Sequence, residues 1–547
     1  MPAVRVAMAQ INPTVGDLAG NSAKIIDFAV RAKDQGANLV LFPELALSGY
    51  PIEDLALSQD FLTSCQEALV NLAGQLAKAG CGEITVIVGY PGFAKKPTSW
   101  AIGQNKAAVI RSGKIEGEYA KHHLPNYSVF DEYRVFVPGQ DLLTFELEKI
   151  KFAIVICEDI WQSGGPVAEI SKSNADLTLV LNGSPFETSK TDSRLALVQS
   201  LAKTHSSAVA YVNLVGGQDD LVFDGNSFVV DSTGREIVRA KQFSEDLVHF
   251  DITSKKDLAT TSETVVQAPE IEQIWNALVL GLRDYVSKNG FSSVVLGLSG
   301  GIDSAVCASV AVDALSAKNV FGVGMPSKYS SEHSLTDARQ LASNTGLNYS
   351  EEPIENVVEA MMSQLPLDGL AAENLQSRVR ALILMGLSNQ NGHLVLTTGN
   401  KTELAVGYST IYGDSVGGFA PLKDVEKGLV WELARYRNEL AKSLGQTPPI
   451  PESSITKPPS AELRPNQLDQ DSLPDYEQLD RLLELHIEQK LSASEIVSRG
   501  FEKEVVESVL KMVRNSEWKR RQGAIGPRIT KLAFGRERRM PITSLPN

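Results

Sequence analysis

The sequence is poor in the features that mark secreted and membrane proteins. Its 547 residues include only four cysteines, Cys65, Cys81, Cys157 and Cys307, and none of them has the C-x-x-C spacing of a metal site. No apolar run approaches about 18 residues, and the N-terminal stretch has no signal-peptide core. We therefore expect neither a disulfide framework nor a membrane-spanning segment, and we expect a cytoplasmic protein.

Positive charge is also scarce. Lys and Arg number 52 against 66 Asp and Glu, which gives a net charge of −14. Such an acidic chain is not expected to bind nucleic acid, because binding to phosphate backbones depends on Lys and Arg. Hydrophobic residues make up 43% and charged residues 22%, as in ordinary globular proteins, and the length is too great for a single core.

A glycine-rich stretch organises the second half of the chain. The apolar run at 294–298 predicts a buried strand of a parallel sheet, and a helix is expected to begin near residues 303–304. A strand, a glycine turn and a helix N-terminus together present backbone N–H groups that favour an anion. No Lys follows the glycines at the spacing of a Walker A loop. The predicted phosphate-binding residues are Gly297, Leu298, Ser299, Gly300, Gly301, Ile302, Asp303 and Ser304.

Three chemically useful side chains in the first half stand where a predicted strand ends. Glu44, Lys121 and Cys157 follow apolar or alternating runs, and strand ends are where α/β sheets place their chemistry. A thiol is a nucleophile when a base removes its proton, and a carboxylate can supply that base. A lysine ammonium favours the thiolate and stabilises an oxyanion. Taken singly, Cys157 also fits a small buried apolar residue.

The order of predicted elements indicates an α/β protein with two domains. Strands, helices and hairpins alternate over residues 1–255, and the polar stretch at 256–269 predicts a linker. Repeated strand–helix units over residues 270–547 favour a doubly wound parallel sheet that binds ligands at its strand ends.

Three sequence words in the first half resemble, in order, the signature regions of the carbon–nitrogen hydrolase (nitrilase) superfamily. They are Phe-Pro-Glu-Leu-Ala-Leu-Ser-Gly-Tyr-Pro, Lys-His-His-Leu-Pro-Asn-Tyr-Ser-Val-Phe-Asp-Glu and Ile-Cys-Glu-Asp-Ile-Trp. The resemblance implies a four-layer αββα sandwich. It also implies that Glu44 is the general base, Lys121 the oxyanion-stabilising lysine and Cys157 the nucleophile, with Glu132 as a supporting carboxylate.

The resemblance further implies an amide substrate. In the branch of the superfamily that uses glutamine, Tyr127, Ser184 and Lys190 match the positions that hold the amino acid, with Phe130 and Arg194 as plausible neighbours. For Ser184 and Lys190 an ordinary polar loop remains an alternative.

The second half resembles a different family. Ser-Gly-Gly-Ile-Asp-Ser is similar to the loop of N-type ATP pyrophosphatases, and Glu-Asn-Leu-Gln-Ser-Arg and Thr-Thr-Gly-Asn-Lys-Thr-Glu are similar to words in NAD synthetases. The whole chain thus resembles the glutamine-dependent NAD synthetase family, which adenylates deamido-NAD and lets ammonia displace AMP. The implied sites are residues 297–304 with Thr398 for ATP, Asn374, Glu403 and Lys519 for deamido-NAD, and Asp303 with Glu403 for Mg²⁺.

These resemblances set the expected partners and leave rivals open. We expect the small molecules deamido-NAD, ATP and L-glutamine, no nucleic acid or membrane, a homo-oligomer, and an internal passage for ammonia. The loops at 325–334 and 453–474 fit either lids or mobile surface. The rivals are another glutamine-dependent ligase with this ATP loop, such as one making GMP or asparagine, and a stand-alone amidase whose second half senses nucleotide. A scaffold would leave both sets of residues unexplained.

Overall fold

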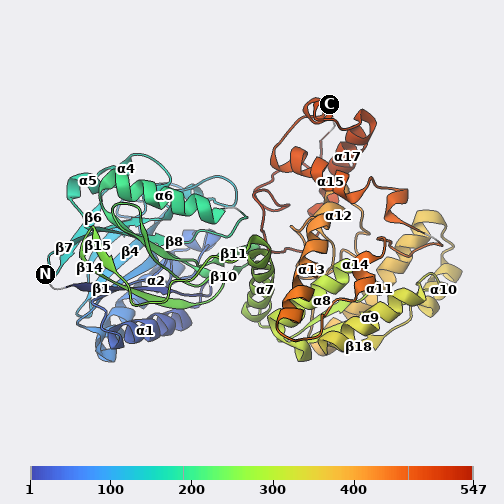
Figure 1. Cartoon of the computed structure of the whole chain (residues 1–547), viewed down its shortest axis with the longest axis horizontal. Coiled ribbons are helices and arrows are strands. Elements are labelled where there is room, and N and C mark those ends of the chain that lie inside the picture. The colour runs from blue at the N-terminus through green and yellow to red at the C-terminus, as the bar shows by residue number, and fades with distance from the viewer. Residues whose placement is uncertain (1–2, 189, 466, 545–547) are drawn as a thin grey trace. The chain divides into compact units, whose positions relative to one another are not determined.

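The computed structural model describes residues 3–188, 190–465 and 467–544, which form two compact units (Figure 1). The first unit comprises the described residues of 1–218 and 222–269, and the second those of 219–221 and 270–547. Among the described residues, no helix combines the length and the apolar character needed to cross a membrane.

Two mixed sheets form the centre of the first unit. One has the strand order β15 (Asp257–Ala259), β14 (Asp246–Ser254), β1 (Val4–Gln10), β2 (Leu39–Leu41), β3 (Thr85–Phe93), β4 (Gly103–Arg111) and β5 (Lys114–Ala120). The other has the order β13 (Glu236–Arg239), β12 (Phe228–Val230), β9 (Ala208–Asn213), β8 (Leu177–Asn182), β7 (Ile150–Ile156) and β6 (Leu143–Leu147). A hairpin, β10 (Val215–Gln218) and β11 (Leu221–Asp224), stands apart from both sheets.

Helices cover the outer faces of the two sheets (Figure 1). They are α1 (Leu18–Asp34), α2 (Gln59–Leu76), α4 (Gly165–Ala168), α5 (Ile170–Ser173) and α6 (Lys190–His205). A further short helix, α3 (Glu132–Val135), follows β5 in the chain. Strand β1 shows how the layers form, because its side chains alternate between two cores. Val6 and Met8 join the core shared with β7 and β8, whereas Ala7 and Ala9 pack with residues of α1 and α2. The predicted αββα sandwich is confirmed.

The structure contains every strand that the sequence predicts in the first unit, but several further strands had no clear signal. The predicted strands lie at 4–10, 39–42, 84–89, 151–156, 177–181, 208–212 and 228–231, and in a hairpin from 107 to 119. Strands β7, β8 and β9 are parallel and almost wholly buried, which explains their continuous apolar sequences. Strands β6, β13 and β14 were not predicted. Residues 257–259, which we expected in the linker, form β15 and pair with β14.

The second unit is built on a four-stranded parallel sheet. The strand order is β18 (Asn348–Glu351), β17 (Val320–Gly324), β16 (Val294–Gly297) and β19 (Leu394–Val395). Its helices are α7 (Glu270–Lys288), α8 (Ile302–Leu315), α9 (Glu332–Thr345), α10 (Glu355–Gln364), α11 (Gly369–Asn391), α12 (Lys401–Val406), α13 (Lys427–Ser443) and α14 (Glu452–Thr456). Val295 and Val323 of the sheet pack against Leu375, Val379 and Leu384 of α11. The predicted doubly wound parallel sheet is confirmed.

A helical cluster follows the sheet in sequence and was not predicted. It comprises α15 (Tyr476–Leu483), α16 (Ala493–Ser498), α17 (Lys503–Asn515) and α18 (Glu517–Arg520). Leu479, Ile496 and Val509 of these helices pack with Ala405 of α12 in one apolar core. This core anchors α12, the helix that follows β19 and carries Glu403.

Candidate active sites

The first candidate site lies where three strands of the sandwich end. Glu44 follows β2, Lys121 follows β5 and Cys157 follows β7. The Lys121 Nζ atom donates to Glu44 Oε1 at 2.7 Å and to Glu132 Oε1 at 2.8 Å. The side chains of Lys121 and Glu44 are fully buried. The structure therefore brings Glu44 together with Lys121 and Glu132, although 77 residues separate Glu44 from Lys121.

Further groups, to which no sequence pattern pointed, hold the carboxylates in place. Asn105 Nδ2 donates to Glu44 Oε1 at 2.7 Å, and the backbone N–H of Gly183 donates to Glu44 Oε2 at 2.8 Å. Tyr50 donates to Glu132 Oε1 at 2.8 Å. Of these, Tyr50 lay within a quoted sequence word, but nothing in its neighbourhood distinguished it from a turn residue. Glu44 thus has a fixed orientation.

Cys157 directly follows β7 in a strained turn, where it is the first residue of a short 3₁₀ helix (Cys157–Ile160). Its φ of 43° lies in the left-handed region, which non-glycine residues rarely adopt and which is often found at functional sites. The residue is only 5% exposed. Burial raises the pKa of the Cys157 thiol well above its usual range, and Glu44 adds to this effect while Lys121 opposes it. The thiol is therefore neutral near pH 7 and needs a base to become a nucleophile.

Lys121 remains a cation although it is buried. Burial alone lowers the pKa of its ammonium, but the carboxylates of Glu132 and Glu44 raise this pKa by a larger amount. The pKa of Lys121 therefore lies well above its usual range. Burial also raises the pKa of Glu132, against the effect of Lys121. A fixed cation beside a neutral thiol and a carboxylate provides what thiol attack on an amide requires: a base and an oxyanion partner.

The residues expected to hold glutamine lie on two sides of this cluster. The Tyr127 hydroxyl donates to Glu158 Oε2 at 2.9 Å, and the Tyr127 and Phe130 rings meet edge to face at 5.8 Å. Lys190 Nζ lies 6.0 Å from the Phe130 ring centre. Ser184 follows Gly183, the partner of Glu44, and its hydroxyl accepts from Arg194 Nε at 3.2 Å. Tyr127 and Lys190 thus lie around Phe130, whereas Ser184 lies next to the backbone N–H that holds Glu44.

Arg194 has a structural role in this region. It is 2% exposed, and its Nη1 atom donates to both oxygens of Asp224 at 2.7 and 3.0 Å. Its Nη2 atom donates to the carbonyl oxygens of Ser184 and Pro185 at 2.9 and 2.7 Å. Arg194 therefore fixes the loop that carries Ser184.

The second candidate site is the glycine turn between β16 and α8. Gly300 has a φ of 74°, and a Cβ built on it would lie 2.2 Å from the Ser334 carbonyl oxygen. Only glycine fits this position. Ser304 Oγ accepts from the backbone N–H of Ser299 at 3.3 Å and donates to the Gly301 carbonyl at 3.0 Å. The turn therefore directs the N-terminus of α8 towards a cavity of about 280 Å³ that is lined by Ser299, Gly301 and Ser304.

Asp303 and Glu403 meet at one side of this cavity, and a lysine joins them. Lys427 Nζ donates to Asp303 Oδ2 at 2.6 Å and to Glu403 Oε1 at 3.2 Å. Asn400 Nδ2 donates to Asp303 Oδ1 at 2.8 Å. Burial raises the pKa of Glu403. The Lys427 cation opposes this rise, and the Asp303 carboxylate adds to it. Lys427 had no distinguishing sequence signal, because it begins a helix far along the chain.

The carboxylate oxygens of this pair are the kind of donor that Mg²⁺ prefers, and Lys427 Nζ already bonds to one oxygen of each carboxylate. Among the described residues, no group of three or more His, Cys, Asp or Glu side chains is placed to hold a metal ion. Two carboxylates are nevertheless enough for Mg²⁺ in nucleotide sites, where phosphate oxygens and water complete its shell.

The two loops expected as lids line the same cavity and are bonded to one another. Glu462 Oε1 accepts from the hydroxyls of Ser331 and Ser334, each at 2.8 Å, and from Lys457 Nζ at 2.8 Å. Ser454 Oγ donates to the Gly300 carbonyl at 3.0 Å. Residue 466, within the second loop, lies outside the described residues. The described parts of both loops cover the glycine turn.

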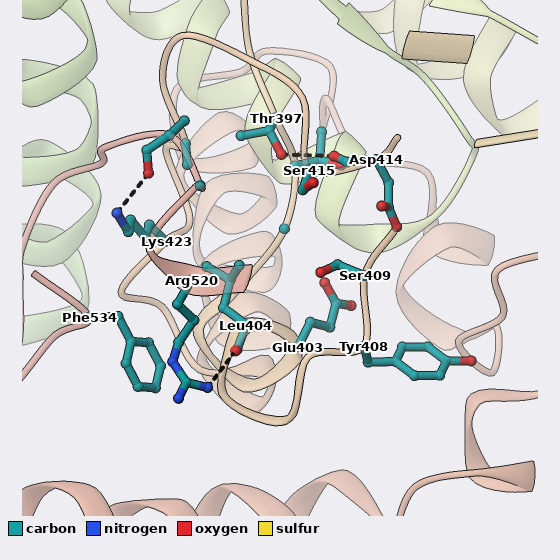
Figure 2. A pocket seen from close by; sticks show the side chains of 15 residues that line it. Thr397, Glu403, Leu404, Tyr408, Ser409, Asp414, Ser415, Lys423, Arg520 and Phe534 are labelled. Atoms are coloured by element: carbon teal, nitrogen blue, oxygen red, sulfur yellow. Dashed lines mark hydrogen bonds between the residues drawn. The ribbon is translucent and has the colours of Figure 1, made fainter. Parts of the chain in front are cut away.

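A smaller cavity adjoins the larger one and shares Thr398, Glu403 and Asp414 with it. Figure 2 shows Glu403, Tyr408 and Asp414 on one side of this cavity, and Lys423 and Phe534 on the other. Burial raises the pKa of Asp414 to about 6. Burial also lowers the pKa of Lys423, whose Nζ atom donates to the Ala524 carbonyl at 2.7 Å.

The three residues expected to bind deamido-NAD converge on one turn. Glu403 lies on α12, directly before this turn. Lys519 Nζ donates to the carbonyl oxygens of Gly407 and Ser409 at 3.0 and 3.1 Å. Asn374 Oδ1 accepts from the Thr410 hydroxyl at 2.7 Å. Residues from α11, α12 and α18 thus contact one segment, and of the three only Glu403 lines the two cavities.

Two family models match the chain, one for each unit. The carbon–nitrogen hydrolase model matches residues 5–258, and the NAD synthase model matches residues 274–523. The first match spans Glu44, Lys121 and Cys157, and the second spans the glycine turn, Glu403 and Lys519.

Relatives match the chain over its full length. The glutamine-dependent NAD(+) synthetase of Acinetobacter baylyi is 47% identical, over 100% of this chain and 99% of that protein. The glutamine-dependent NAD(+) synthetase of Aquifex aeolicus is 43% identical over 99% of each. A solved structure of glutamine-dependent NAD+ synthetase from Acinetobacter baumannii, in complex with ADP, is 43% identical with a TM-score of 0.78. This alignment covers 99% of this chain and 98% of that one.

Proposed function

The chain belongs to the glutamine-dependent NAD(+) synthetase family, and from this membership we propose how its two sites divide the reaction. The protein is a glutamine-hydrolysing ligase that forms a carbon–nitrogen bond. Its first unit releases ammonia from glutamine, and its second unit uses ATP and that ammonia to convert deamido-NAD into NAD.

In the first site, Cys157 attacks the side-chain amide carbon of glutamine. Glu44 takes the thiol proton as the carbon–sulfur bond forms, and Lys121 faces the negative oxygen of the tetrahedral intermediate. Collapse of the intermediate breaks the carbon–nitrogen bond, and the returned proton lets ammonia leave. Water then hydrolyses the thioester and gives glutamate. Tyr127, Ser184 and Lys190 hold the amino acid. The raised pKa of the buried thiol supports this assignment, because a neutral thiol needs the base that Glu44 supplies.

In the second site, a carboxylate oxygen of the nicotinate ring attacks the α-phosphorus of ATP. Pyrophosphate leaves, and ammonia then attacks the resulting acyl-adenylate, so that AMP leaves and the amide remains. Residues 297–304 and Thr398 hold the phosphates and nucleoside of ATP, and Asn374, Glu403 and Lys519 hold deamido-NAD. Asp303 and Glu403 would hold Mg²⁺, which supplies charge neutralisation at the phosphates when it is bound. The glycine turn, with the N-terminus of α8 directed at the cavity, supports this assignment.

Ammonia is a nucleophile only when it is unprotonated, and near neutral pH most free ammonia in water is protonated. We therefore include in the proposal that ammonia passes from Cys157 to the acyl-adenylate without equilibrating with bulk solvent. Within the second unit, the small cavity beside Glu403 offers a place from which ammonia can approach. A homo-oligomer is part of the proposal as well.

The observation that carries the proposal is the convergence of buried Glu44, Lys121 and Cys157 at neighbouring strand ends. Cys157→Ala tests it. This variant should lose glutamine-driven NAD formation and still form NAD from ammonium salts. Cys65→Ala, another buried free cysteine, is the matched control and should keep both activities. Loss of both activities in Cys157→Ala would refute the division of labour.

Substrate comparison separates the rivals. Deamido-NAD, and not xanthosine monophosphate or aspartate, should support AMP formation from ATP. A stand-alone amidase would hydrolyse glutamine without releasing AMP and pyrophosphate.

A further inference from the structure

The Asp159 carboxylate is fully buried and accepts four hydrogen bonds. Its Oδ1 atom accepts from the backbone N–H groups of His122 and His123 at 3.1 and 2.8 Å. Its Oδ2 atom accepts from the Tyr119 hydroxyl at 2.6 Å and from the backbone N–H of Ile156 at 2.9 Å. A carboxylate oxygen has two lone pairs, so both oxygens are fully used.

These four donors come from the two segments that carry the reacting groups. His122 directly follows Lys121 in the chain, and Ile156 directly precedes Cys157. One carboxylate thus joins the end of β5 to the end of β7. Lys121 has additional bonds to Glu44 and Glu132, but the Cys157 thiol makes no hydrogen bond within the part of the chain that the structure describes. The position of the sulfur therefore depends on the strained turn that Asp159 supports.

We propose that Asp159 is a positioning residue of the glutamine-hydrolysing site, which fixes the Cys157 turn against the segment of Lys121. The inference rests on the proposed function of Cys157. Asp159 itself does not touch glutamine; it acts by holding the sulfur at a fixed distance from the Glu44 base and the Lys121 cation. A misplacement of about 1 Å at such a site costs about 100-fold in rate.

Asp159→Asn tests this role with little change in volume. The asparagine carbonyl oxygen can accept from only one pair of donors, and its NH₂ group must then face the other pair. The tyrosine hydroxyl can turn and accept a bond, whereas a backbone N–H cannot. The NH₂ group is therefore expected to face Tyr119 and Ile156, and the carbonyl oxygen to keep the bonds from His122 and His123. The turn at Cys157 then loses its support.

We expect Asp159→Asn to lower kcat for glutamine hydrolysis about 100-fold and to leave the KM for glutamine nearly unchanged. A residue that only stabilises the fold would change kcat and KM together, or would lower the folded fraction of the first unit. kcat is therefore calculated per folded protein, with the folded fraction taken from thermal unfolding. NAD formation from ammonium should stay at the wild-type rate. A wild-type kcat, or a rise in KM that accounts for the loss, would overturn the inference.

Two tyrosine variants keep the test decisive if Asp159→Asn does not fold. Tyr119 and Tyr90 belong to the same sheet and are each 1% exposed. The Tyr119 hydroxyl donates to the Asp159 carboxylate, and the Tyr90 hydroxyl donates to the Glu118 carboxylate. Only Tyr119 is bonded to the support of Cys157. Tyr119→Phe should lower kcat without raising KM, and Tyr90→Phe should not lower it. Equal effects of the two changes would refute the positioning role.

Cys157→Ala, measured in parallel, separates this inference from the proposed function. Glutamine hydrolysis by Cys157→Ala would contradict the proposed nucleophile. An inactive Cys157→Ala together with a fully active Asp159→Asn would contradict only the positioning role.

Discussion

Gly300→Ala should disable the ATP site and leave glutamine hydrolysis intact. The φ of 74° at Gly300 costs an alanine about 1–2 kcal/mol. The new Cβ would lie 2.2 Å from the Ser334 carbonyl oxygen, and because real contacts are at least 3.0 Å, the loop must move by about 0.8 Å. Such overpacking costs a further ~1–3 kcal/mol. The loop therefore shifts, and the backbone N–H groups no longer face the phosphates.

A shift of this size corresponds to a loss of about 100-fold in kcat/KM for ATP. The assay is NAD formation from ATP, deamido-NAD and ammonium at varied ATP, with glutamine hydrolysis by the same preparation as the internal control. Gly301→Ala is the matched variant, because Gly301 has a φ of −82° and its added Cβ meets only the Ser299 hydroxyl, at 3.2 Å. A flexible hydroxyl can move aside, so Gly301→Ala should lose much less activity. Equal losses in the two variants would refute this reasoning.

Three further changes probe other groups. Burial raises the pKa of the Cys157 thiol, so its alkylation by iodoacetamide should be slow at pH 7. The rate should increase as the pH rises beyond the usual pKa range of thiols. A fast reaction at pH 7 would show a preformed thiolate. Arg194→Met leaves Asp224 buried without its cation, which should destabilise the first unit by about 3–5 kcal/mol and raise the KM for glutamine, as thermal unfolding and kinetics can measure. Lys427→Met removes the ammonium that fixes both Asp303 and Glu403 in place, and should abolish NAD formation from both nitrogen sources while glutamine hydrolysis persists. Retained synthesis would show that the lysine is dispensable.

The parts of the fold that could be predicted are those whose signal is local. The apolar runs of β7, β8 and β9, and the glycine turn after β16, each determine their own conformation. Strand β14 pairs with β1 across more than 200 residues of sequence, and it mixes half-buried and buried residues without a long apolar run. The helices after residue 475 are amphipathic, but their core includes residues of α12, a partner that periodicity alone does not identify.

In the candidate sites, too, residues with a local sequence signal were predicted and residues placed only by folding were missed. The structure places Glu44, Lys121 and Glu132 in one cluster, as the sequence words led us to expect, but their functional roles remain predictions. Asn105 and Lys427 were missed because only folding brings them to the carboxylates that they contact. In the sequence, 61 residues separate Asn105 from Glu44, and 124 separate Lys427 from Asp303. Asp159 lay within a quoted word, yet only its four hydrogen bonds distinguish it from its neighbour Glu158.

The central claim is that the amide nitrogen of glutamine becomes the carboxamide nitrogen of NAD within one protein. The most direct test supplies ATP, deamido-NAD and [amide-¹⁵N]glutamine with unlabelled ammonium at a concentration that by itself supports little NAD formation. It measures the mass of the NAD formed with the yield of AMP. The account predicts ¹⁵N-labelled NAD, one molecule for each AMP. Unlabelled NAD would contradict the retained ammonia, and glutamate formation without AMP or NAD would contradict the account as a whole.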